Sequence, residues 1–113
     1  MRLVHAPEVE PQEVMEEGAA KVTVRWLLSR PEGAPSFAMR LFEVAPGGQT
    51  PQHEHTWEHE VFVLEGRVEV IGKEAAAELT PGDAVLVLPS EPHQFRNRGE
   101  NTARFLCMIP LPE

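Results

Sequence analysis

Four of the five histidines in this chain lie in its central and C-terminal parts, at His53, His55, His59 and His93. His53 and His55 are two residues apart, so on an extended strand both imidazoles point to the same face. The three residues after His55 are enough to turn into a next strand and bring His59 alongside, whereas a separate hairpin must supply His93. Neutral imidazole binds manganese, iron, nickel, copper and zinc, so convergence of these side chains predicts a metal site. The alternative is that they are surface or hydrogen-bonded core histidines.

The composition limits the classes of protein to which the chain can belong. Its 113 residues suffice for one domain, and 42% hydrophobic with 25% charged residues is typical of a folded soluble protein. A net charge of −8 argues against nucleic acid and anionic membrane surfaces as partners. The single cysteine, Cys107, excludes an internal disulfide and a thiolate zinc cluster. With no long apolar run and no secretory signal at the start, we expect a cytoplasmic protein without a membrane partner.

The elements that must position the histidines are short strands. Residues 1–20 are acidic and predict a loosely held N-terminal arm with one short helical turn, and residues 21–113 predict a single all-β barrel domain. Val22, Val24, Trp26 and Leu28 alternate with other residues, which is the period of a half-buried strand. Further strands are expected at 37–45, 59–64, 67–71, 75–79, 84–88, 92–96 and 102–109. Pro46-Gly47-Gly48 is expected to end the 37–45 strand, and Gly66 to close a hairpin between 59–64 and 67–71.

Several of these strands are apolar on both faces. Phe62 and Leu64 alternate with Val61 and Val63, so one face fills the barrel and the other needs a cover. A homodimer is the simplest cover, and a terminal segment folded back over the sheet is the alternative.

Two spaced motifs surround the histidines. The first has Gly47, five residues, His53-Glu54-His55, three residues, His59, six residues and Gly66. The second begins at Gly82 and keeps the distances to His93 and Asn97, with its proline displaced to Pro89 and Glu91 in place of a glycine. Both motifs resemble those of the cupin family. The resemblance spans Gly47–Asn97 and implies a double-stranded β-helix, or jelly-roll, barrel.

One position departs from the family pattern. His59 occupies the place of the usual metal-binding glutamate, and Glu60 next to it faces the opposite side of the strand. In this respect the chain resembles the small four-histidine cupins of thermophilic bacteria. That resemblance implies one divalent metal per chain bound by His53, His55, His59 and His93. Manganese is the expected metal, and iron, nickel, copper and zinc are the alternatives.

A site of four neutral imidazoles keeps the whole +2 charge of the metal and is therefore a stronger Lewis acid than one that includes a carboxylate. Four protein ligands leave two positions of an octahedral metal open, for a chelating substrate or for one substrate atom beside dioxygen. We therefore expect a metal-dependent oxidoreductase of the dioxygenase type, acting on a small organic molecule. No catalytic residue is predicted beyond the ligands.

Alternation along the strands predicts the lining of the substrate pocket. It places inward the side chains Val61, Phe95, Phe105 and Cys107, which describes an apolar and aromatic pocket. Trp57 is expected either to cover the pocket or to pack in a dimer contact. Arg40 is within reach of an anionic substrate, although a surface position is commoner for arginine.

Three other functions stay open. The first is a non-catalytic module that binds a small molecule. The second is a purely structural metal site, although structural zinc sites generally use cysteine. The third is a Lewis-acid or metal-independent isomerase or epimerase on the same fold.

Overall fold

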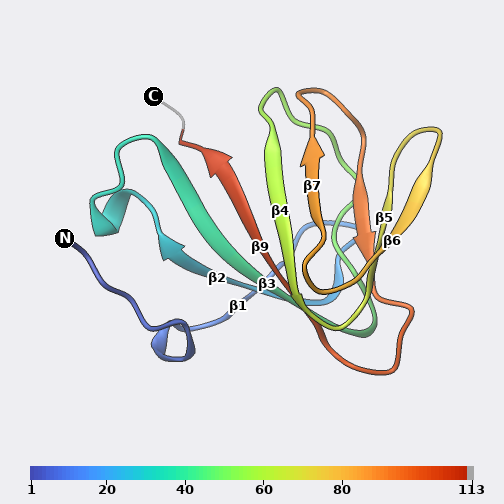
Figure 1. Cartoon of the computed structure of the whole chain (residues 1–113), viewed down its shortest axis with the longest axis horizontal. Coiled ribbons are helices and arrows are strands. Elements are labelled where there is room, and N and C mark those ends of the chain that lie inside the picture. The colour runs from blue at the N-terminus through green and yellow to red at the C-terminus, as the bar shows by residue number, and fades with distance from the viewer. Residues whose placement is uncertain (112–113) are drawn as a thin grey trace.

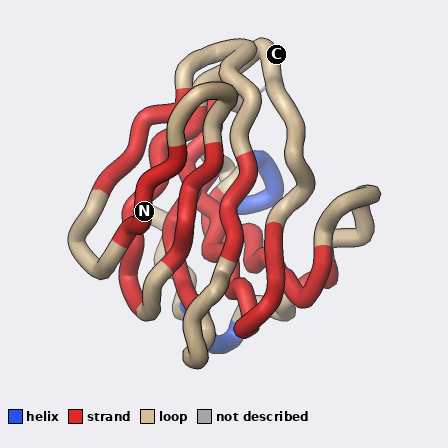
Figure 2. The backbone as a smooth tube through the Cα atoms, turned by 90° about the vertical axis from the view of Figure 1, so that its right-hand side faces the viewer, coloured by secondary structure: helices blue, strands red, loops and turns tan. Residues whose placement is uncertain are grey.

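The computed structural model describes residues 1–111, in which nearly all the regular secondary structure is β-strand. Figure 1 shows the arrangement of the strands, and Figure 2 shows them linked by long loops with two short helical segments. The strands are β1 Gln12–Glu13, β2 Ala20–Leu28, β3 Phe37–Gln49, β4 His59–Glu65, β5 Val68–Ile71, β6 Ala76–Leu79, β7 Ala84–Val87, β8 Gln94–Arg96 and β9 Ala103–Pro110. Two short 3-10 helices, η1 Ala6–Glu8 and η2 Arg30–Glu32, complete the set of described elements.

The strands form one curled antiparallel sheet in the order β6-β5-β8-β3-β9-β4-β7, with β2 paired to β3 and β1 to β2. The long strand β3 joins the two parts of the curl, because it pairs with β2 and β9 along most of its length and with β8 at its end. Figure 1 shows β5 and β6 on one side of the molecule and β1 to β3 on the other. The expected jelly-roll barrel is confirmed.

Strand β3 is longer than the sequence predicts. It continues through the Pro46-Gly47-Gly48 segment to Gln49, so the expectation that this segment ends the strand is wrong. Gly47 has a φ of +81°, and a Cβ at Gly48 would lie 2.8 Å from the carbonyl oxygens of Ala20 and Lys21. The glycines therefore allow β2 and β3 to approach closely across an irregular register, rather than breaking the strand.

The predicted hairpin between residues 59–64 and 67–71 is also wrong. Strand β4 pairs with β7 and β9, whereas β5 pairs with β6 and β8. Gly66 does have a positive φ, +74°, but there the chain crosses from one part of the sheet to the other. A Cβ at Gly66 would lie 2.5 Å from the Thr102 carbonyl oxygen and 2.8 Å from the Ala103 Cα, which explains why this crossing needs glycine.

The core fills the inside of the curl. On β4, His59, Val61 and Val63 are buried while Glu60 and Phe62 are exposed, as a period of two requires. Phe105 on β9 is fully buried, and its ring lies 5.4 Å from that of Phe42 and 5.0 Å from that of Phe95. This aromatic layer supports the inner end of the functional site.

The N-terminal segment is attached to the sheet by backbone pairing. Strand β1, which the sequence analysis does not predict, pairs with β2, and the Val14 amide donates to the Val22 carbonyl at 3.1 Å. Gln49 Nε2 donates to the Gly18 carbonyl at 2.8 Å. The division into an arm at 1–20 and a barrel at 21–113 stays a prediction. Among residues 1–111 no helix is long and apolar enough to cross a membrane.

Candidate metal centre

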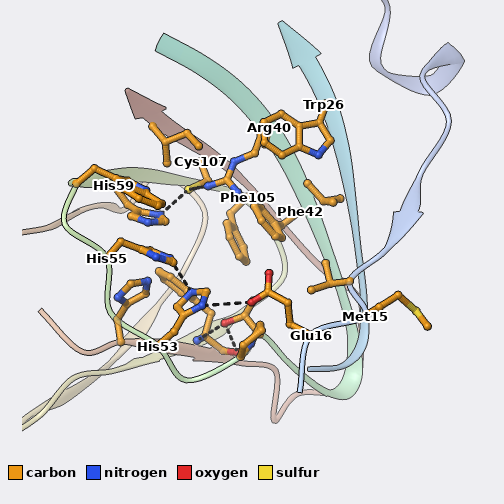
Figure 3. Close-up of a pocket in the computed structure, with 18 of the residues that line it drawn as sticks. Met15, Glu16, Trp26, Arg40, Phe42, His53, His55, His59, Phe105 and Cys107 are labelled. Atoms are coloured by element: carbon orange, nitrogen blue, oxygen red, sulfur yellow. Dashed lines mark hydrogen bonds and ion pairs between the residues drawn. The ribbon is translucent and has the colours of Figure 1, made fainter. Parts of the chain in front are cut away.

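Backbone pairing brings the histidines together, and Figure 3 shows His53, His55 and His59 on one side of the cavity. His53 and His93, forty residues apart, form an isolated antiparallel bridge in which each amide donates to the other's carbonyl, at 3.2 and 3.0 Å. His59 is the first residue of β4, paired with Val87. His55 lies in the loop before β4, where its carbonyl accepts a hydrogen bond from the Ser90 amide.

The imidazoles converge at a spacing that suits a metal ion. His53, His55 and His93 offer nitrogens that all lie within 4.8 Å of one another, and the Nε2 atoms of His53 and His55 are 3.1 Å apart. Two nitrogens bound at right angles to one metal lie about 3 Å apart, given bonds of about 2.1 Å. The His59 ring lies beside this group, with its centroid 5.0 Å from that of His55 and 4.9 Å from that of His93. His59 as the fourth ligand stays a prediction.

Hydrogen bonds orient two of the rings and leave one nitrogen of each without a protein partner. His93 Nδ1 is 2.9 Å from the Glu91 carbonyl oxygen, so Nδ1 carries the proton and Nε2 keeps its lone pair. His59 Nδ1 is 3.3 Å from Cys107 Sγ, and His59 Nε2 is buried with no hydrogen-bond partner. A buried nitrogen without a partner is costly unless it binds something. The donor set therefore fits a divalent transition metal.

Burial and neighbouring positive charge favour the neutral forms of His53, His55 and His59. Burial, together with the nearby Arg40 and the other imidazoles, lowers the pKa of His59 to about 3. Burial is also the main cause of the lowered pKa of His53 and of His55. Neutral imidazoles have free lone pairs at neutral pH, which is the state that binds a metal.

The histidines open into a cavity of about 370 Å³. Of the predicted pocket residues, Arg40, Trp57, Phe95, Phe105 and Cys107 line it. Val61 faces the same interior but does not line the cavity, because it packs in the hydrophobic core at 1% exposure. The Trp57 ring stacks on that of His55, with centroids 4.6 Å apart and planes 5° apart, and remains 41% exposed.

Cys107 connects the histidine group to Arg40. Arg40 Nη2 donates to Cys107 Sγ at 3.0 Å, and the same sulfur lies 3.3 Å from His59 Nδ1. Burial raises the pKa of the Cys107 thiol, although Arg40 acts in the opposite direction. The thiol is therefore favoured in its neutral form between Arg40 and the His59 ring.

The sequence analysis misses part of this cavity. Its further lining residues include Glu13, Val14, Met15, Glu16, Trp26 and Phe42. Glu16 Oε2 lies 3.6 Å from His53 Nδ1, so the N-terminal segment supplies a carboxylate beside the histidines. The alternation of residues 22–28 predicts a strand that includes Trp26 but not its place in the pocket, and nothing in the acidic run of the first twenty residues indicates that this segment closes a pocket.

Known proteins are similar to this chain in both sequence and structure. A family model described as a cupin domain matches residues 40–109. The 1-methylthio-D-xylulose 5-phosphate methylsulfurylase of Rhodospirillum rubrum is 32% identical over 105 residues, which are 91% of this chain and 67% of that protein.

Among solved structures, the polyketide cyclase RemF from Streptomyces resistomycificus superposes with a TM-score of 0.91 at 40% identity, over 97% of this chain and 79% of that one. A cupin-2 domain protein of Rhodospirillum rubrum gives a TM-score of 0.85 at 29% identity, over 98% and 75% of the two chains. Together with the jelly-roll barrel and the converging histidines, these similarities show that the chain belongs to the cupin family.

Proposed function

We propose that the protein is a metal-dependent enzyme that acts on a small ketone bound in the cavity beside the four histidines. The observation that carries the proposal is the buried, unpartnered Nε2 of His59 among neutral imidazoles at the wall of a 370 Å³ cavity. Such a donor set suits one divalent transition metal. Manganese is the first metal to test, after the thermophilic four-histidine cupins, followed by iron, nickel, copper and zinc.

The names of two relatives support a ketone as the substrate. One relative is a polyketide cyclase and the other acts on a xylulose phosphate, and both substrate names denote compounds with ketone groups. The histidines would hold a divalent cation, which when bound would supply Lewis-acid polarisation of the ketone oxygen and so acidify the neighbouring C–H bonds. Removal of a proton next to the carbonyl is therefore the reaction that we propose.

The residues of the chain supply the rest of the machinery. The rings of Phe42, Phe95 and Phe105 exclude water from the inner cavity and hold the apolar part of the substrate. The carboxylates among the described lining residues are those of Glu13 and Glu16. Glu16 Oε2 lies 3.6 Å from His53 Nδ1, and its carboxylate is the base that we propose accepts the proton.

A dioxygenase-type oxidoreductase is the second candidate. It is favoured by the apolar, aromatic lining next to the histidines, because that lining suits a hydrophobic substrate and offers few groups for acid-base work. Non-catalytic binding of the same ligand is the third.

Hydrogen-deuterium exchange separates these candidates. The metal-loaded protein is incubated with dihydroxyacetone in D2O, and exchange next to the carbonyl, above the rate without protein, is followed by NMR with and without dioxygen. We expect exchange that does not need dioxygen and that falls about 100-fold or more in Glu16→Gln. The control is Glu17→Gln, whose exposed side chain does not line the cavity.

The outcomes are distinct. Exchange at an unchanged rate in Glu16→Gln contradicts the role of Glu16. Consumption of dioxygen without exchange supports the oxidoreductase, and binding with neither reaction supports the non-catalytic module.

We also propose that a second copy of this chain covers the outward face of β4 and β7. This outward apolar face consists of Phe62, Leu64, Leu86 and Leu88, which are 40–55% exposed. Strand β7 pairs only with β4 among residues 1–111, so its other edge is open beside this face. A homodimer would bury both features.

A further inference from the structure

Arg40 occupies an unusual place for an arginine. It lies in one cross-strand row between Trp26 on β2 and Cys107 on β9, and it lines the cavity (Figure 3). Its Cζ is 5.3 Å from the centroid of the Trp26 ring and 4.9 Å from that of Phe42. The two rings hold the guanidinium in place and leave its N–H edge available.

The positive charge of Arg40 has no carboxylate partner. None of the ion pairs among residues 1–111 includes it, and its side chain makes one hydrogen bond, from Nη2 to the sulfur of Cys107. Its Nε is buried and has no acceptor. Most of its five donors are therefore unused.

Other arginines of the same sheet behave differently. On the opposite face of the same strands, Arg25 and Arg104 lie 3.0 and 3.3 Å from the carboxylate of Glu43. The sheet thus pairs these arginines outside the cavity and leaves Arg40 unpaired inside it. Because an unpaired charge next to apolar walls is costly, an anion from outside the chain is the missing partner.

We infer that Arg40 is the binding site for an oxyanion of the substrate, a carboxylate or a phosphate. The substrate is then a small keto acid or keto phosphate whose ketone lies at the histidines and whose anionic group pairs with the guanidinium. Arg40 is preorganised by the Trp26 and Phe42 rings, and its planar fork matches either oxyanion. This inference rests on the proposed function for the position of the ketone.

The test uses pairs of ketones that differ in charge. Binding of 4-oxopentanoate and its methyl ester, and of dihydroxyacetone phosphate and dihydroxyacetone, is measured by calorimetry on the metal-loaded protein. Trp26 and Trp57 both line the cavity, so tryptophan fluorescence gives a second readout. We expect the anionic member of at least one pair to bind about tenfold more tightly or better, as for a hydrogen-bonded charge pair. The pair with the larger ratio of affinities shows whether the site prefers a carboxylate or a phosphate.

Variants assign this preference to a residue. Arg40→Met should abolish the preference, Arg40→Lys should keep part of it, and Arg104→Met should keep all of it. Metal content is measured in each variant, because a merely structural role of Arg40 beside Cys107 and His59 would lower metal content and weaken both members of a pair equally. Equal binding of both members in the wild type, or an unchanged preference in Arg40→Met or Arg40→Lys, overturns the inference.

Failure of the proposed function gives a different pattern. If no ketone, neutral or anionic, binds more tightly with metal than without, the ketone site is wrong. Inorganic phosphate binding to the chelator-treated protein still tests Arg40, because we expect this binding to disappear in Arg40→Met and to persist in Arg104→Met. Unchanged phosphate affinity in Arg40→Met overturns the inference independently of the metal.

Discussion

The two faces of strand β4 differ in burial and in what their side chains contact. Inward, His59, Val61 and Val63 are 6% exposed or less and join the histidine group and the core. Outward, Phe62 and Leu64 are about as apolar but are 40% and 42% exposed. Alternate residues of one strand thus serve a chemical site and a surface. Hydrophobicity alone therefore does not distinguish a residue of the site from a residue of the surface. Substitutions on the inward face should affect the core and the histidines, and those on the outward face should not.

The largest difference in stability between a buried and an exposed position is expected for two phenylalanines. Phe105→Ala empties the aromatic layer beneath the histidines, and we expect it to lower the free energy of unfolding by about 3–5 kcal/mol. Phe37→Ala is the control, because Phe37 is 62% exposed and its loss leaves no cavity. Denaturant unfolding measures both. Equal losses in the two variants would contradict the placement of Phe105.

The inward histidines should make the metal-free protein sensitive to acid. The pKa of His59 is about 3 in the folded state and near 6.5 when unfolded, so between these values the unfolded state binds the extra proton. The contribution of neutral His59 to the free energy of unfolding is therefore fully present above pH 7 and is lost as the pH decreases from 6.5 towards 3. The slope is at most about 1.4 kcal/mol per pH unit for each such histidine.

Denaturant titrations of the chelator-treated protein at several pH values measure this slope. His59→Gln should make it shallower, and His5→Gln, at an exposed N-terminal position, is the control. A slope that is the same in His59→Gln as in the wild type would show that His59 is not buried in its neutral form.

The smallest effect on the site is expected from the outward face. Phe62→Ser with Leu86→Ser should convert the proposed dimer to monomer, because it removes the centre of the apolar face, while metal content stays as in the wild type. Sedimentation measures the mass, and elemental analysis measures the metal. A wild type that is already monomeric at high concentration would rule out the dimer.

The sequence predicts much of the fold because its signals are local. The seven strand ranges expected after residue 36 match β3 to β9 within a few residues at most ends, and the spacing of His53, His55 and His93 predicts their convergence. Alternation with a period of two predicts which side chains share a face of a strand, and Gly66 predicts a turn of the chain.

Local sequence patterns do not determine which strands become neighbours in the sheet. The turn at Gly66 has the same signature in a hairpin as in a crossing between the two parts of the sheet, and the glycines at 47 and 48 serve a close approach as readily as a strand end. The position of Glu16 beside His53 depends on the pairing of β1 with β2, two residues in a segment of unremarkable acidic composition. These contacts arise from the whole barrel.

Metal content per chain is the most direct test of the proposal that the histidines bind a metal ion. The untagged protein is purified without chelator and analysed by elemental mass spectrometry beside His93→Gln and His5→Gln. We expect about one divalent transition metal per chain in the wild type and in His5→Gln, and almost none in His93→Gln, whose circular dichroism should remain that of a folded β protein. A folded wild type without metal even after incubation with manganese, iron or zinc, or full metal content in His93→Gln, would contradict the account.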